Sequence, residues 1–132
     1  MAGLTEDDVA LLRARNHVHF VTLHPDGSPH VTPMWVDADE AGHVLVNTSV
    51  GRVKDRNVRR DPRVALSVMD ANDPYRWVSV TGEVVEMIEG PAADAHIDAL
   101  CHRYHDEPWE PVPGQRRVIY RVRPDRVARG LG

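Results

Sequence analysis

The chain has 132 residues, enough for one domain with a buried core and too few for two. Its single cysteine, Cys101, excludes an intrachain disulfide, and a reducing cytoplasm is the expected compartment. The N-terminal segment lacks the apolar core of a signal peptide, and no segment approaches the roughly 18 apolar residues of a membrane span. We therefore expect one soluble, cytoplasmic domain over residues 1–132 with no membrane partner.

The hydrophobic pattern predicts a helix at the start of the chain and then β-structure. Thr5, with Asp8 three residues later, resembles a capping box and indicates a short helix that ends before Asn16. Residues 18–23 alternate with a period of two, as in a half-buried strand. Residues 25–27, Pro-Asp-Gly, then predict a hairpin turn.

The next elements are predicted to surround an open sheet edge. The return strand of the hairpin runs from residue 30 to about 36 and contains Pro33, which cannot donate a ladder hydrogen bond, so we expect an edge strand or a bulge there. A third strand over 43–48 leads into a helix over about 52–60. Asp61-Pro62 ends that helix, since a residue before proline disfavours helical geometry.

The second half of the chain predicts strands at 64–69 and about 75–88, with a bulge or barrel corner at Gly82. Gly90-Pro91 begins a helix, and a last strand covers 117–123. The fold class is therefore mainly β with short helices, an antiparallel and nearly closed barrel of about six strands. No dinucleotide-binding or phosphate-loop glycine motif is present.

Charge is segregated along the chain, whose net charge is −4. Residues 51–63 contain six cations and two acids, for a net charge of +4, and Lys54 is the only lysine among sixteen cationic residues. A single lysine in an arginine-rich chain indicates a site that suits a compact ammonium. Nucleic acid is not the expected partner, because the pI is near 6.0 and this basic segment has no aromatic residue.

The segment from Asn47 to Asn57 predicts an anion site. Thr48 and Ser49 end a strand that feeds a helix, where free backbone N–H groups and the positive end of the helix dipole meet. Arg52 and Lys54 oppose this dipole by a few tenths to about 1 kcal/mol each, so a bound anion is expected to offset them. The alternative is a capped helix with a solvated basic face.

No residues of the sequence predict metal or nucleophilic chemistry. His102 and His105 are three apart beside Cys101, but Cys101 belongs to an apolar stripe and no fourth ligand is placed nearby. No nucleophile has a base and an orienting acid, so we expect no catalytic side chain and a cofactor that carries the chemistry of any enzyme.

The tryptophans allow two interpretations. Trp35 and Trp77 flank a planar ring or pack in a core or dimer interface, and Trp109 is a lid over a pocket or a surface plug. An edge strand interrupted by Pro33, together with three tryptophans, leaves apolar surface to cover, which predicts a homodimer independently of any relative.

Three segments together resemble a known family. They are DGSPHVTPMWVD, VLVNTSVGRVKDRNVRRDPRVALSV and DPYRWVSVTGEV. They resemble the split β-barrel, FMN-binding-like proteins of the pyridoxamine phosphate oxidase type, and within them the deazaflavin-dependent oxidoreductases of actinobacteria. The resemblance covers residues 5–90, and the final third of the chain departs from it.

The resemblance implies a homodimer that binds coenzyme F420, or alternatively FMN, at the subunit interface. Its implied activity is hydride transfer from the reduced deazaflavin to a small unsaturated or quinone-like substrate, and a non-catalytic F420 carrier is the competing class. The implied phosphate clamp is Arg52 and Lys54, helped by Asn47, Thr48, Ser49 and Asn57. Pro33, Met34 and Trp35 would line the ring, and Tyr75, Arg76 and Trp77 would come from the partner subunit.

Overall fold

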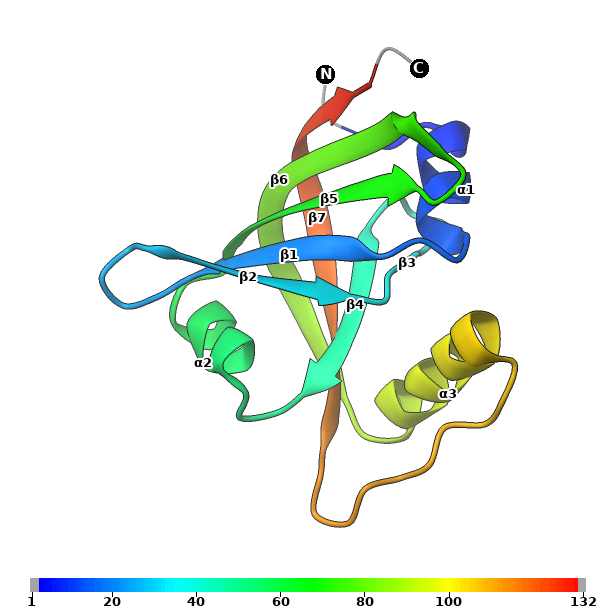
Figure 1. Cartoon of the computed structure of the whole chain (residues 1–132). Coiled ribbons are helices and arrows are strands. Elements are labelled where there is room, and N and C mark those ends of the chain that lie inside the picture. The colour runs from blue at the N-terminus through cyan, green and yellow to red at the C-terminus, as the bar shows by residue number, and fades with distance from the viewer. Residues whose placement is uncertain (1–2, 131–132) are drawn as a thin grey trace.

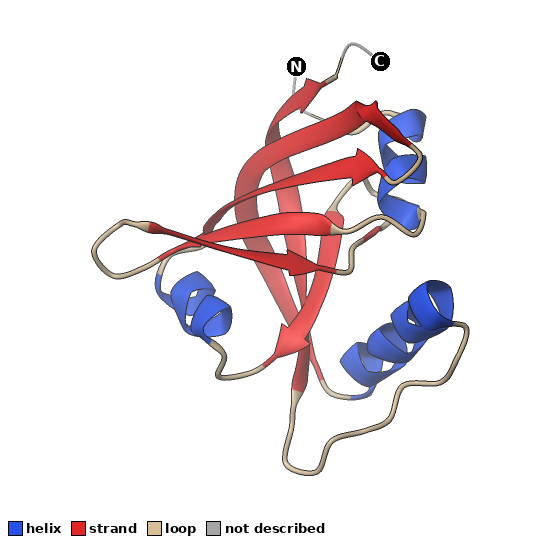
Figure 2. Ribbon diagram, viewed as in Figure 1, coloured by secondary structure: helices blue, strands red, loops and turns tan. Residues whose placement is uncertain are grey.

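The sheet has seven antiparallel strands rather than about six, in the order β2-β1-β5-β6-β7-β4-β3, curled into a half-barrel (Figures 1 and 2). This computed structural model describes residues 3–130. The strands are β1 (Val18–Leu23), β2 (Pro29–Met34), β3 (Asp37–Ala38), β4 (Val44–Ser49), β5 (Arg63–Asp70), β6 (Asp73–Glu89) and β7 (Arg117–Arg129). The helices are α1 (Glu6–Arg13), α2 (Val53–Arg60) and α3 (Pro91–His105).

Strands β1 and β2 form the predicted hairpin, and β2 is an edge of the sheet. Pro33 pairs with His19, and β2 has no second neighbouring strand in the sheet. The expectation of an edge strand is therefore confirmed. The strand ends at Met34, however, so Trp35 lies in the connection to β3, a two-residue strand that the sequence pattern did not predict.

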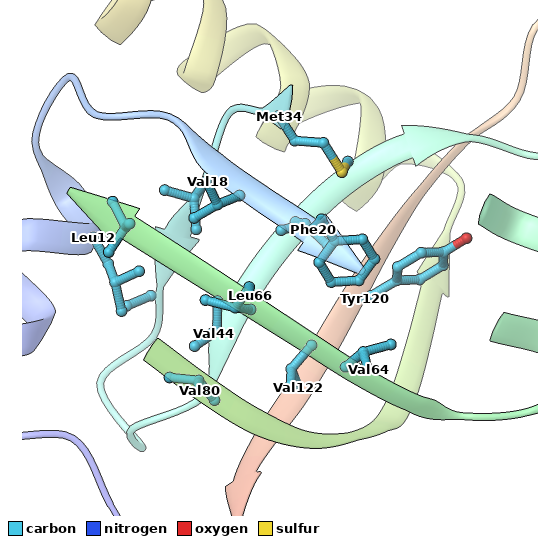
Figure 3. Packing of buried hydrophobic residues seen from close by; sticks show 14 of the residues in the cluster. Leu12, Val18, Phe20, Met34, Val44, Val64, Leu66, Val80, Tyr120 and Val122 are labelled. Atoms are coloured by element: carbon cyan, nitrogen blue, oxygen red, sulfur yellow. The ribbon is translucent and has the colours of Figure 1, made fainter. Parts of the chain in front are cut away.

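The core fills the concave side of the sheet (Figure 3). The predicted alternation holds in β1, where Val18, Phe20 and Thr22 are each fully buried. Phe20 stacks on Tyr120 of β7 with ring centroids 6.3 Å apart. Burial of such side chains contributes about 1.5 to 3 kcal/mol each, and it fixes the strand register because a one-residue shift would turn this face outward.

The long strands β6 and β7 are paired along most of their length through two irregularities. One lies at Gly82, as predicted, where Gly82 pairs with Pro124 and Thr81 with Arg126, so Asp125 is the extra residue. The predicted end of the last strand at residue 123 is wrong, because this bulge accommodates Pro124 and β7 continues to Arg129.

The three helices begin where local chemistry allows. Thr5 and Asp8 form the predicted capping box of α1. Helix α3 begins after Gly90, whose φ of +82° suits glycine, with Pro91 in the first turn. Helix α2 begins at Val53 rather than Arg52, which occupies the N-cap position without a side-chain cap hydrogen bond. In Figure 1, α2 and α3 lie on opposite sides of the end of β4.

Candidate functional site

A cavity of about 370 Å³ opens at the end of β4, between the region of α2 and that of α3. Its volume is within the usual range of small-molecule sites, about 300 to 1,000 Å³. Eleven residues line it: His17, Pro33, Met34, Trp35, Asn47, Thr48, Arg52, Lys54, Ile97, Trp109 and Arg117. Cationic, hydroxyl and aromatic side chains thus face the same space.

The turn that leads from β4 into α2 is held by the buried carboxylate of Asp55. It accepts hydrogen bonds from the backbone N–H of Gly51 at 2.8 Å, from the hydroxyl of Tyr120 at 2.6 Å and from Nε of Arg59 at 2.9 Å. Burial opposes ionisation of Asp55, but these hydrogen bonds outweigh it and lower its pKa. Gly51 has a φ of +93°, which favours glycine, so sequence and hydrogen bonding fix the same turn.

Two buried cations and one exposed cation face the cavity. Lys54 and Arg117 are each 8% exposed, and Arg52 stands at the exposed mouth. Burial, followed by repulsion from Arg52 and Arg117, lowers the pKa of Lys54. Burial, followed by repulsion from Arg52, lowers the pKa of Arg117 to about 10, and attraction to Asp94 offsets part of this. The cavity thus holds positive charge that its own residues do not neutralise.

Two polar groups of this cavity lack hydrogen-bond partners among the described residues. The ammonium of Lys54 forms no hydrogen bond or ion pair with any residue between 3 and 130. The hydroxyl of Thr48, whose residue is 1% exposed, is buried without a hydrogen-bond partner in the described part of the chain. Buried polar groups are normally paired, and an unpaired one costs about 1 to 3 kcal/mol. These groups fit a bound anion such as a phosphate.

The other wall of the cavity is apolar and aromatic. Trp35 stacks on Tyr104 of α3, with ring centroids 5.1 Å apart and planes 7° from parallel, and Met34 beside it is 8% exposed. Trp109 lies against the Arg117 guanidinium, 5.8 Å from its carbon to the ring centroid. A rigid aromatic wall next to an anion site suits a planar ring that carries a phosphate.

The structure brings together seven of the twelve residues assigned from the sequence. Those that line the cavity are Pro33, Met34, Trp35, Asn47, Thr48, Arg52 and Lys54. Ser49 is buried next to the cavity but does not line it. Asn57 is also outside it, because its amide donates to the hydroxyl of Thr22 at 3.1 Å and so joins α2 to β1.

Tyr75, Arg76 and Trp77 lie in the first part of β6 and do not contact this cavity within one chain. Tyr75 is 75% exposed and Trp77 is 39% exposed. Arg76 forms an ion pair with Asp70 at 2.9 Å. Their assignment to a shared site therefore depends on a second copy of the chain and stays a prediction.

Three lining residues were not singled out from the sequence: His17, Ile97 and Arg117. Trp109, for which the sequence left a pocket lid and a surface plug open, also lines the cavity. In β7, Val118, Tyr120 and Val122 belong to the hydrophobic core, and the alternation of a strand leaves Arg117 on the outer face. Helix α3 covers that face at the start of β7, so Arg117 and Ile119 are buried as well. Only tertiary packing reveals this, although the helical stripe of α3 already indicated a face to bury.

An ion-pair network lies behind the cavity, between β3 and α3. Asp37 contacts Nε2 of His96 at 3.1 Å and accepts from Arg103 at 2.9 Å. Arg103 also donates to the carbonyl of Val36 at 2.9 Å. Burial opposes ionisation of Asp37, but the hydrogen bonds from His96 and Arg103 outweigh it and lower its pKa to about 2.

The lowered pKa of Asp37 predicts a defined pH dependence of stability. A carboxylate whose folded-state pKa is below its unfolded value stabilises the fold above the unfolded value, and this stabilisation is lost as the pH falls through the folded value. Asp37→Asn should therefore unfold at lower denaturant concentration than the wild type at pH 7. We expect the difference to shrink between about pH 4 and pH 2 in equilibrium denaturation. A difference that is constant across this range would contradict the assignment.

Within residues 3–130, no group of three or more histidine, cysteine or acidic side chains is arranged to hold a metal ion. No helix in the same range is long and apolar enough to cross a bilayer.

The pyridoxamine 5'-phosphate oxidase family model matches residues 4–129. The chain belongs to this family. Its split β-barrel fold is the one that the sequence motifs indicated, and the expectation of a mainly antiparallel β-fold is confirmed. A comparison with curated proteins gave no match.

Solved structures of this family share the fold. An F420 reductase is 34% identical, with a TM-score of 0.82, and the match covers 95% of this chain and 98% of that protein. A conserved hypothetical protein from Mycobacterium tuberculosis is 26% identical, with a TM-score of 0.76 and coverage of 96% and 84%. A candidate pyridoxamine 5'-phosphate oxidase from Listeria innocua is 17% identical, with a TM-score of 0.71 and coverage of 94% and 95%, which shows the fold alone.

Proposed function

We propose that the chain is a coenzyme F420-dependent oxidoreductase that reduces a small unsaturated or quinone-like substrate. The observation that carries this proposal is the cavity in which the unpaired Lys54 ammonium and Thr48 hydroxyl lie beside the Trp35 wall. The similarity to an F420 reductase at 34% identity supports the choice of cofactor. FMN is the alternative, because it presents the same combination of a phosphate and a planar ring.

The residues of the cavity have defined roles in this proposal. Lys54 and Arg52 bind the phosphate, and the hydroxyl of Thr48 donates a hydrogen bond to the same anion. Trp35, Met34 and Pro33 hold the ring and exclude water from one of its faces. When bound, the reduced deazaflavin supplies a hydride, and the substrate takes its balancing proton from solvent.

Titration and turnover experiments test this proposal. Fluorescence titration of the protein with F420 and, separately, with FMN measures which cofactor binds at micromolar concentration. Reduced F420 is then mixed with a panel of quinones and enones, and the return of its absorbance reports turnover. Binding of F420 with turnover supports the proposal, and binding without turnover on any acceptor favours a carrier. Tighter binding of FMN favours a flavoprotein, and binding of neither cofactor would overturn the proposal.

We also propose that the active unit is a homodimer. Met69 of β5 is 52% exposed and pairs with Trp77 of β6 on the outer face of the sheet. Both line a second cavity of about 590 Å³, and His17 lines this cavity as well as the first. A second copy seated over the second cavity would therefore reach the first, which supports the assignment of Tyr75, Arg76 and Trp77 to a shared site.

The dimer is tested by static light scattering at micromolar concentration. We expect about twice the mass of 14.8 kDa that one chain has. Trp77→Lys introduces a charge beside Met69 on the outer face of the sheet and should shift the mass toward that of one chain. Arg63→Glu, at an exposed side chain at the other end of β5, is the control and should leave the mass unchanged. A wild-type mass near 14.8 kDa would contradict the dimer and the shared site together.

A further inference from the structure

Arg117 fixes the orientation of the amide that lies next to it. Its Nε donates to Oδ1 of Asn47 at 2.9 Å, and a guanidinium has no acceptor, so the Asn47 atom facing it must be the oxygen. The Asn47 nitrogen then faces the carbonyl of Ala93 at 2.9 Å, to which it donates. Two independent partners therefore define the two ends of this buried amide.

The orientation of Asn47 in turn fixes the tautomer of His96. The Asn47 nitrogen also lies 3.2 Å from Nδ1 of His96. Since that nitrogen is a donor, Nδ1 must accept and carries no proton. The ring proton is then on Nε2, which donates to Asp37 at 3.1 Å. Arg117, Asn47, His96 and Asp37 thus form one chain of hydrogen bonds, in which each residue donates to the next from the cavity to β3.

The end of this chain is an arginine built into the cavity wall. Arg117 is 8% exposed, and none of the ion pairs formed within the described residues involves it. Its other contacts are the side-chain oxygen of Gln115 at 3.2 Å and the Trp109 ring. A buried guanidinium held by a neutral amide keeps its full charge available for an anion.

We infer that Arg117 is an anion-binding residue of the cavity, and that neutral His96, in its Nε2–H tautomer, is the residue that positions it through Asn47. The inference rests on the proposed function, since the anion is the charged group of the cofactor or of its substrate. It adds a third cation to Arg52 and Lys54, and it lies so close to both that burial, followed by repulsion among the three, lowers the pKa of Lys54 and of Arg117. The class of ligand is therefore one that brings more than a single negative charge to this cluster of three cations, as a phosphate group does.

Affinity measurements on four variants test both parts. Arg117→Ala removes a charge-assisted contact and should weaken F420 or FMN binding about tenfold or more. Arg116→Ala is the matched control, because Arg116 is exposed, does not line the cavity and forms a long ion pair with Glu89 at 3.9 Å. This variant should leave affinity unchanged. His96→Asn places an amide oxygen where Nδ1 stands and should retain affinity. His96→Gln reaches only the Nε2 position, and we expect about a three- to tenfold loss.

Nitrogen-15 spectra of the histidine rings give a readout that does not depend on binding. Long-range proton–nitrogen correlations of the wild type, assigned with His96→Asn, should show a bare Nδ1 and a protonated Nε2. A proton on Nδ1 would overturn the positioning role. Equal affinities of His96→Asn and His96→Gln would also overturn it.

The same measurements separate this inference from the proposed function. If Lys54→Ala weakens binding and Arg117→Ala does not, the inference fails while the proposed function stands. If the wild type binds neither cofactor, both fail. Thermal unfolding of every variant identifies any loss of affinity that comes from a damaged fold.

Discussion

Replacing Lys54 with alanine is expected to weaken cofactor binding by roughly tenfold to more than a hundredfold. The ammonium would form a charge-assisted hydrogen bond with the phosphate, which contributes about 1.5 to 3 kcal/mol. Without ligand, Lys54 is buried among cations and its pKa is lowered, so its removal relieves repulsion. The free energy of unfolding of the free protein should therefore change by less than about 1 kcal/mol.

Two further variants make the Lys54 result specific. Lys54→Arg keeps the charge, but its planar fork is longer than an ammonium, so we expect only partial recovery of affinity. Arg60→Ala removes a cation at the far end of α2, where Arg60 donates to Asn57 at 3.1 Å, and it should leave binding unchanged. Fluorescence titration measures all three. If Lys54→Ala binds no worse than Arg60→Ala, α2 has only a solvated basic face.

Gly82→Ala is expected to cost about 3 kcal/mol or more of folding stability. A Cβ atom at this position would lie 1.9 Å from the carbonyl oxygen of Arg123 and 3.0 Å from its carbon. Both are backbone atoms of β7, so no side-chain rotation relieves the contact and the two strands must separate. Against a total stability of about 5 to 15 kcal/mol, this is a large loss.

Gly114→Ala is the matched control for this prediction. Gly114 has a φ of +80° and no atom within 4 Å of an added Cβ, so only backbone strain of about 1 kcal/mol is expected. Urea denaturation of both variants, followed by circular dichroism, gives the two free energies of unfolding. Equal losses would show that the close approach of β6 and β7 at Gly82 is not a constraint.

The fold could be predicted from the sequence to the extent that local signals determine it. The Thr5–Asp8 cap, the edge strand at Pro33 and the irregularity at Gly82 have local signals, because each is indicated by one residue or by two residues three positions apart. The extension of β7 past Pro124 has no local signal in the sequence. A proline ordinarily ends a strand, and only its pairing with Gly82, 42 positions earlier, shows why this one does not.

The candidate site divides in the same way. Thr48, Arg52 and Lys54 are close in sequence, so the strand-to-helix pattern was sufficient to group them. Arg117 and Ile97 reach the same cavity only because α3 packs on the start of β7. For Asn57, closeness in sequence gave the wrong assignment. It lies within the basic helix by sequence, but the helical rotation turns it toward Thr22 and away from the cavity.

The hydrogen bond from Gly51 to Asp55 has a kinetic consequence. Because the carboxylate already holds the turn at 2.8 Å, an arriving anion does not have to wait for residues 49–52 to order. Its association rate is then governed by diffusion toward a positive cavity mouth at Arg52. At an ionic strength of 0.1 M this attraction is largely screened beyond about 10 Å. Added salt should therefore lower the association rate of the ligand much more than it raises the dissociation rate.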